Sequence, residues 1–306
     1  MQKCLLLGNG INVHFGISDL YLTNIADRFK DVLINSSSLY ECLFGVSFTP
    51  ALCDSLFSSA PNLGIETLSA EIFKYVYTNM KDQSTLNSEY RLHNAIKTSA
   101  INAIFYNREK LISIPDFNQA EINVLKKYHS IYTLNYVEFW NTEDLCTYLH
   151  GAYEPIETNS NTPILLYSAE QYRLPEYKKV INNLGHQYNM LAFNGHGIVF
   201  SPLLDKQKLL GLVHYPAKNL YPAEDLFPYD PPKLYTELDS VPSLDVFGMS
   251  PFGDDKLISQ LINIDDLTIY VYQMNHSEVS EWNKLLKRSC CKDSSLFWDE
   301  GRTHHF

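Results

Sequence analysis

Two glycines directly after a short apolar run are the first residues of this sequence that could do chemistry. The run Cys4–Leu7 has the length of a buried strand, and Gly8, Asn9 and Gly10 follow it. A strand that enters a glycine turn and then a helix suits a phosphate, because backbone without Cβ atoms can approach an anion closely. The same glycines also fit a plain turn, so both interpretations stay open. The GxGxxG fingerprint is not met, because Val13 occupies the position of its third glycine.

Strands that alternate with helices must position this turn. Further strands are predicted by the apolar runs Ser130–Leu134, Leu145–Leu149, Gly197–Phe200, Leu244–Phe247 and Leu267–Tyr272. Between the runs, apolar residues recur at helical spacing, for example at Leu22, Ile25, Ala26 and Phe29. The alternation predicts an α/β fold with a Rossmann-like open parallel sheet and helices on both faces.

One domain with two insertions is the predicted organisation. We expect residues 1–280 to form a nucleotide-binding domain. Residues from about 30 to 125 hold no convincing strand and predict a helical insertion, whereas residues from about 152 to 240 are rich in Tyr, Pro and Asn and predict an irregular one. Residues 281–306 are interpreted as a C-terminal tail.

Composition bounds the class of protein. The chain has 306 residues, 45% of them apolar, and a formal net charge of −11. No basic run is present, so we expect no direct nucleic-acid binding. No apolar stretch is long enough for a signal-peptide core or a membrane span, which predicts a soluble cytoplasmic protein.

The cysteines and histidines indicate no metal site. No CxxC pair occurs among the six cysteines, and His186 and His196 lack the spacing of metal ligands. The adjacent Cys290 and Cys291 are either a redox pair or, as we expect in the cytoplasm, two reduced thiols.

Four segments resemble, in order, the motifs of the sirtuin (SIR2) family. Gly8–Asn12, three further residues and then Gly16–Tyr21 are similar to GAGIS-x-x-x-GIPDFR, and Thr133–Val137 is similar to TQNID. His150-Gly151 resembles the catalytic HG, and the run VFGMSPFGDD from Val246 resembles a segment that carries a nucleotide-contacting Gly and Ser. The resemblance covers roughly residues 1–30, 125–155 and 240–275.

The sequence also departs from these motifs. Tyr21 replaces the Arg of the first motif, Val137 replaces the final Asp of the second, and the zinc ribbon of the deacylating sirtuins is missing. Protein deacylation therefore ranks lowest among the functions considered. The pattern is closer to the SIR2-like domains of bacterial anti-phage systems, which consume NAD and often carry GNG, TxNYD and LHG.

The resemblance implies roles for particular residues. Asn135, whose amide can donate and accept, would position ribose or an attacking water, and His150 would act as the base. Asp19 would lie near the nicotinamide carboxamide. The other implied nucleotide contacts are Gly8, Asn9, Gly10, Ile11, Asn12, Gly248 and Ser250. Structural alternatives remain open for several of these residues: a strand cap for His150, a turn residue for Asn135, a helix N-cap for Asp19, and a strand end for Gly248 and Ser250. For His14 we expect local packing.

The implied activity is NAD+ hydrolysis to nicotinamide and ADP-ribose, with NAD as substrate and no metal. The resemblance further implies an NAD-depleting effector of anti-phage abortive infection. Such an enzyme must be restrained, by a homo-oligomer or by a partner such as a HerA-type ATPase. The alternative is a non-catalytic module that binds NAD or ADP-ribose within a defence complex, and the changes at Tyr21 and Val137 motivate it.

Overall fold

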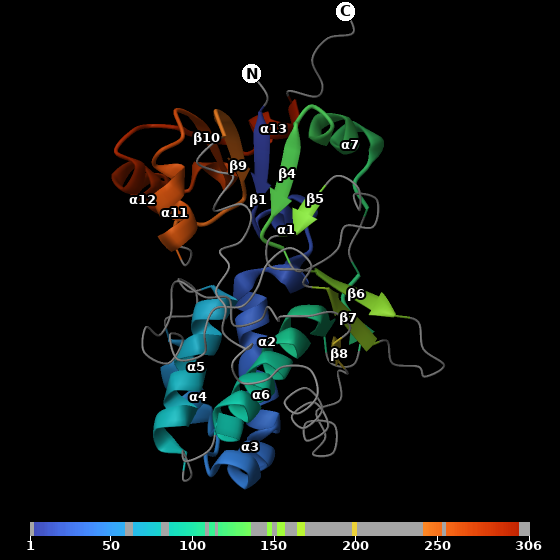
Figure 1. Cartoon of the computed structure of the whole chain (residues 1–306), viewed down its shortest axis with the longest axis vertical. Coiled ribbons are helices and arrows are strands. Elements are labelled where there is room, and N and C mark those ends of the chain that lie inside the picture. Colours follow the sequence, from blue (N-terminus) through green and yellow to red (C-terminus); the bar gives the residue numbers. More distant parts are fainter. Residues whose placement is uncertain are drawn as a thin grey trace, which may run out of the picture.

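Figure 1 shows the computed structural model of the chain, with a sheet in the upper part of the view and a helical bundle in the lower part. The structure describes residues 3–58, 64–80, 86–107, 110–113, 116–135, 146–148, 152–156, 164–168, 198–200, 241–252 and 255–299. No helix within these ranges is long and apolar enough to cross a membrane.

The centre of the structure is a six-stranded sheet with the order β11-β10-β9-β1-β4-β5, in which every described pair of neighbours is parallel. Its strands are β1 (Cys4–Leu7), β4 (Ser130–Thr133), β5 (Cys146–Tyr148), β9 (Ser243–Phe247), β10 (Asp266–Val271) and β11 (Cys291–Asp293). Numbered along the chain, these strands lie in the order 3-2-1-4-5-6, which is that of the Rossmann fold. The predicted Rossmann-like parallel sheet is confirmed.

Helices cover both faces of the sheet, because successive side chains of a strand point to opposite sides. Cys4 and Leu6 of β1 pack in one core with α11 and α12, and Leu5 and Leu7 pack in a second core with α7 and α13. The bounds of these helices are α7 Gln119–Leu125, α11 Asp255–Leu261, α12 His276–Leu286 and α13 Ser295–Asp299. Burial on both faces explains why β1 is a continuous apolar run.

A helical bundle with its own core follows β1. It consists of α2 (Leu22–Asn35), α3 (Ser37–Phe44), α4 (Pro50–Phe57), α5 (Ile65–Asn79) and α6 (Leu86–Phe105). Local signals set its turns: Gly45 ends α3 with a φ of 74°, and the Thr49 hydroxyl caps α4 by accepting from Leu52 N at 3.3 Å. The bundle begins at Leu22, earlier than the predicted insertion, and lies beyond the carboxyl ends of the parallel strands (Figure 1).

Short strands occur in both predicted insertions. The two-residue strands β2 (Tyr106–Asn107) and β3 (Lys110–Leu111) pair antiparallel in the segment where we expected no strand. In the second insertion, β6 (Ala152–Ile156), β7 (Ile164–Ser168) and β8 (Ile198–Phe200) form a separate antiparallel sheet. The run Gly197–Phe200 was therefore a correct strand prediction but was wrongly placed in the parallel sheet. The rest of residues 152–240 lies outside the described part of the chain.

The predicted C-terminal tail is wrong for the residues that the structure describes. Trp282 is fully buried in one core, β11 forms the edge strand beside β10, and Phe297 is buried in the other core. Residues up to Asp299 thus complete the sheet domain. The prediction failed because β11 is only three residues long and contains Lys292 and Asp293, so it shows no apolar run.

The buried carboxylate of Asp245 contacts two segments that precede strands of the sheet. Lys3 Nζ lies 2.7 Å from Asp245 Oδ1, and the Tyr128 hydroxyl donates to Asp245 Oδ2 at 2.6 Å. Asp245 is in the middle of β9 and is 1% exposed. These contacts link β9 to the start of β1 and to the segment before β4, and so support the strand order around β1.

A buried lysine in the helical bundle gives a stability prediction. Lys97 in α6 is fully buried, and burial lowers its pKa well below the ordinary value. Because the unfolded chain then binds this proton more strongly than the folded chain, stability should rise as the pH increases between the lowered pKa and the ordinary one. We expect Lys97→Met to remove this pH dependence of the free energy of unfolding.

Chemical denaturation between pH 7 and pH 10 checks this expectation. Lys74→Met is the matched control, because Lys74 is an exposed helical lysine of the same bundle. The control should stay within about 0.5 kcal/mol of the native chain. An unchanged pH slope in Lys97→Met would contradict the prediction.

Candidate functional site

The strand order places a topological switch point at β1. From β1 the chain continues to β4 and β5 on one side, and later to β9, β10 and β11 on the other. Ligands of open α/β sheets bind beyond the carboxyl ends of the strands at such a point. The residues that follow β1, β4 and β9 are Gly8–Asn12, Asn135 and Gly248–Ser250, which are segments of three of the four sirtuin-like motifs. The fold therefore brings these segments to one place.

Backbone hydrogen bonds join the three segments directly. Gly8 N donates to Phe247 O at 2.8 Å, and Gly10 N donates to Gly248 O at 2.7 Å. On the other side of β1, Leu134 N donates to Leu7 O at 2.9 Å. The turn after β1 is thus attached to both neighbouring strands.

The three glycines of this contact are required by backbone packing. A Cβ on Gly8 would lie 2.5 Å from Gly248 O, and one on Gly10 would lie 2.6 Å from Gly248 Cα. Gly248 itself has a φ of +67°, and its Cβ would lie 2.7 Å from Gly10 Cα. We expected the missing Cβ atoms to make room for a ligand, but in the structure their positions are filled by neighbouring backbone. Close approach to a phosphate stays a prediction.

Few N–H groups of the turn remain for an anion. Besides Gly8 and Gly10, Ile11 N donates to Gly8 O at 3.2 Å, and Asn12 N donates to Asn9 O at 3.1 Å. Within the described part of the chain, the Asn9 N–H has no acceptor. The helix that follows, α1 (Ile11–His14), has four residues, so its dipole is small. The turn is therefore a weaker phosphate cradle than the sequence pattern suggested.

Asn135 is held rigidly at the end of β4. It is 3% exposed, and its Nδ2 donates to Gly8 O and to Thr133 Oγ1, both at 3.0 Å. Thr133 Oγ1 also accepts from Asn135 N at 3.1 Å and donates to Leu7 O at 3.2 Å. Both Nδ2 hydrogens are used within the protein. We expected this amide to donate and accept toward a ligand, but only its oxygen remains, so Asn135 can act there only as an acceptor.

Asn12 and Asn9 extend this network. Asn12 Nδ2 donates to Asn9 Oδ1 at 2.6 Å and to Asn135 Oδ1 at 3.4 Å. Asn9 Nδ2 in turn donates to Leu20 O at 3.4 Å. Asn12 is 2% exposed, and its Oδ1 has no hydrogen-bond partner within the described residues. A buried acceptor without a donor is uncommon and needs an explanation.

Asp19 joins the turn to the helical bundle. It lies in the 3₁₀ helix Ser18–Leu20, where its Oδ1 accepts from Asn107 Nδ2 at 3.3 Å and lies 3.7 Å from Arg28 Nη1. Burial lowers the pKa of Arg28, and the charge of Asp19 opposes this shift. The alternative role as a helix cap is not seen, because Tyr21 is the N-cap of α2 and no side chain caps it. The Asp19 side chain is 43% exposed and so remains accessible to a ligand.

The other residues that we assigned to the site from the sequence lie in different surroundings or outside the described part of the chain. Ser250 is exposed, and its Oγ accepts from Phe252 N at 3.3 Å. Ile11 is fully buried and anchors α1 in the core. His150 and Gly151 lie outside the described residues, as do Tyr136, Val137, His186 and His196. Among the described residues, no three His, Cys, Asp or Glu side chains gather as a metal-binding group.

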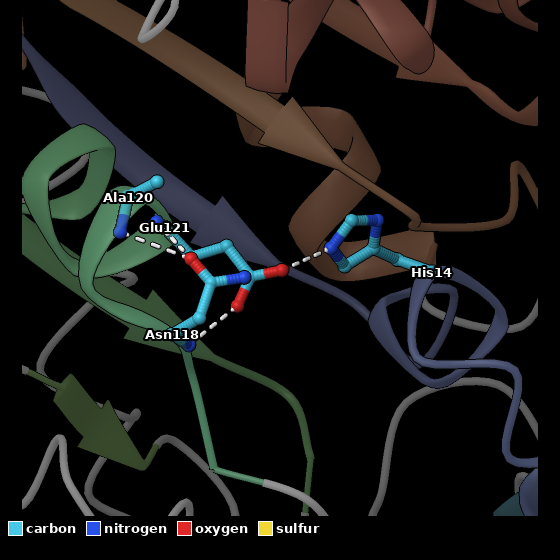
Figure 2. Close-up of polar contacts among 4 residues, drawn as sticks. All are labelled: His14, Asn118, Ala120 and Glu121. Carbon is cyan, nitrogen blue, oxygen red and sulfur yellow. Dashed lines mark hydrogen bonds and ion pairs between the residues drawn. The ribbon is translucent and has the colours of Figure 1, made fainter.

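His14 contacts residues that are distant in the sequence, and Figure 2 shows its contact with Glu121 of α7. Its Nε2 lies 2.7 Å from Glu121 Oε1, and its ring stacks on Trp298 with centroids 4.4 Å apart. Glu121 also closes a capping box, since Glu121 Oε2 accepts from Asn118 N at 2.7 Å. The pattern Asn118-x-x-Glu121 before an apolar run could have predicted this helix start. Nothing in the sequence indicates the partnership with Trp298.

The two adjacent cysteines show no sign of reactivity. Both are free, burial raises the pKa of Cys290, and burial raises that of Cys291 to about 11. Thiolate, the reactive form, is therefore scarce at neutral pH.

A comparison of the chain with family models, with curated proteins and with solved structures gave no match.

Proposed function

We propose that the chain is an NAD+ glycohydrolase, which cleaves the bond between nicotinamide and ribose to give nicotinamide and ADP-ribose. The observation that carries the proposal is the meeting of Gly8–Asn12, Asn135 and Gly248 at the switch point of a Rossmann-ordered sheet. These segments lie far apart in the sequence and were singled out by their resemblance to sirtuin motifs. Their convergence at the ligand-binding edge of the sheet supports a common dinucleotide site.

The chemistry requires positioning and a base. Cleavage passes through an oxocarbenium-like state, nicotinamide leaves as a neutral ring, and water supplies the hydroxyl of ADP-ribose and releases one proton. Asn135 Oδ1 is a fixed acceptor that can orient a ribose hydroxyl or the water. By resemblance, His150 takes the proton.

The biological role that we propose is NAD depletion in anti-phage abortive infection. The support is the resemblance of GNG, YTLNY and YLHG to the SIR2-like defence branch. Free NAD hydrolysis would harm the cell, so the role requires restraint by a homo-oligomer or by a partner such as a HerA-type ATPase.

Chromatography of nicotinamide tests the activity. Purified chain is incubated with NAD, alone and with candidate partners, and His150→Ala is run beside it. We expect release by the native chain and a decrease of at least about 100-fold in the variant. Unchanged NAD under every condition would count against the proposal.

A non-catalytic NAD or ADP-ribose binding module is the second candidate. One observation that favours it is that Tyr21 and Val137 replace the Arg and the Asp of the family motifs. Another is that most backbone N–H groups of the turn Gly8–Asn12 already donate to acceptors within the protein. Calorimetry that shows binding without nicotinamide release would support this candidate, and absence of binding would exclude it.

A further inference from the structure

Arg28 of α2 contacts two other parts of the chain with one guanidinium group. Its Nε donates to Ala103 O in the last turn of α6 at 2.8 Å, and its Nη2 donates to Asp19 O. Its Nη1 lies 3.7 Å from Asp19 Oδ1. Arginine suits this position because its donors form a planar fork that can bind several acceptors at once. Arg28 thus connects the 3₁₀ helix Ser18–Leu20 to both α2 and α6.

The guanidinium lies mostly inside the protein. The Arg28 side chain is 14% exposed, and a charged group at this depth is costly unless it is paired and hydrogen-bonded. Two other side chains also donate to the 3₁₀ helix: Asn24 Nδ2 to Ser18 O at 2.8 Å, and Asn107 Nδ2 to Asp19 Oδ1 at 3.3 Å. Both of these hydrogen bonds are exposed to solvent, so the contacts of Arg28 should contribute most.

Further hydrogen bonds connect the 3₁₀ helix with the turn after β1. Ile17 N, directly before the 3₁₀ helix, donates to Asn12 O at 3.0 Å. From the turn, Asn9 Nδ2 donates to Leu20 O at 3.4 Å. The position of the turn Gly8–Asn12 therefore depends on that of the 3₁₀ helix, which Arg28 connects to the bundle.

We propose that Arg28 is a positioning residue, through which the helical bundle holds the 3₁₀ helix Ser18–Leu20, and with it the turn Gly8–Asn12, in the geometry that binds the nucleotide. This inference rests on the proposed function, because it takes the turn as part of the NAD site. Since Arg28 bridges α2 and α6, a change in the packing of these two helices would also reach the turn.

The test compares the native chain with two variants at position 28. Arg28→Met removes every donor but keeps an unbranched apolar stem, and Arg28→Lys keeps the charge but offers a single nitrogen in place of the fork. Lys30→Met is the matched control, because Lys30 lies on the same helix and pairs with Asp54 of α4, within the bundle. Thermal melting establishes which variants are folded, and Arg28→Lys carries the test if Arg28→Met does not fold.

Amide hydrogen exchange of the chain without nucleotide is the first readout. The reporters are the N–H groups of Leu20, Tyr21 and Asn12, which donate within the 3₁₀ helix and the turn. We expect them to exchange at least about tenfold faster in Arg28→Met, and to change in the same direction but less in Arg28→Lys, whereas the amides of β9 and the control variant stay within about twofold. Native exchange at these reporters in either variant would overturn the inference. Faster exchange confined to α2 and α6 would show a merely structural role and would overturn it too.

Nucleotide binding is the second readout. A turn that is no longer held in place should raise the calorimetric Kd for ADP-ribose at least about tenfold in Arg28→Met, because ordering the turn then opposes binding. The KM for NAD should rise with it, while kcat stays within about threefold. A structural role alone would reduce the folded fraction, which lowers kcat and leaves KM unchanged.

The outcomes separate this inference from the proposed function. Faster exchange in the turn of Arg28→Met, together with no nicotinamide release by the native chain under any condition, would refute only the proposed function. Nicotinamide release by the native chain, with unchanged exchange or an unchanged Kd for ADP-ribose in folded Arg28→Met, would refute only the inference.

Discussion

Gly248→Ala should lose about 2–5 kcal/mol of unfolding free energy, the largest stability effect that we expect from a single methyl group in this chain. Two costs combine at this position. The left-handed φ of +67° is strained for alanine, and the new Cβ would lie 2.7 Å from Gly10 Cα and 2.9 Å from Ile11 N. These neighbours are backbone atoms that cannot rotate away, so the turn after β1 must move.

Gly16→Ala separates the two costs. Gly16 has the same φ of +67°, but a Cβ there would meet nothing within 4 Å. It should therefore lose only about 1–2 kcal/mol. Denaturant unfolding of both variants gives the difference, which measures the backbone contact between the turn and β9. Equal losses in the two variants would show that this contact is not tight in solution.

Asn135→Ala should reduce nicotinamide release by at least about 100-fold. The substitution removes a fixed acceptor oxygen and leaves Gly8 O and Asn12 Nδ2 each without a partner that they now have. Nicotinamide release under saturating NAD is the measurement.

Thr133→Val is the informative companion to this variant. Valine has nearly the shape of threonine but lacks the hydroxyl that orients the Asn135 amide. We expect a smaller loss, of about tenfold, because Gly8 O still fixes one Nδ2 hydrogen. Native activity in Asn135→Ala would show that Asn135 takes no part in the mechanism. A greater loss of nicotinamide release in Thr133→Val than in Asn135→Ala would contradict the proposal that Thr133 acts through Asn135.

Much of the sheet could be predicted because both of its faces are buried. β1, β4 and β9 appear as apolar runs, and the turn after β1 is marked by its glycines. β11 was missed because an edge strand needs few apolar residues, and Cys291–Asp293 offers none of the usual signals. The run Gly197–Phe200 was recognised as a strand but assigned to the wrong sheet, because an apolar run does not reveal which strands it pairs with.

The sequence resemblance singled out residues that the fold brings together, but it did not reveal their hydrogen bonds. Asn12 and Asn135 were identified by motif resemblance, yet the residue type alone leaves each amide free to donate or accept. Which atoms donate and which accept depends on the carbonyl oxygens of Leu7, Gly8 and Leu20. These oxygens come close to the polar side chains only in the folded chain. The contact between Gly10 and Gly248 likewise joins distant residues, so one sequence could not distinguish ligand approach from backbone packing.

A crystal structure of the purified chain with ADP-ribose tests the central claim most directly. We predict that the nucleotide lies beyond the carboxyl ends of β1 and β9, in contact with the turn Gly8–Asn12 and with Gly248–Ser250, and that a ribose hydroxyl or a water contacts Asn135 Oδ1. ADP-ribose bound elsewhere, for example on the bundle α2–α6, or no binding at all, would contradict the account.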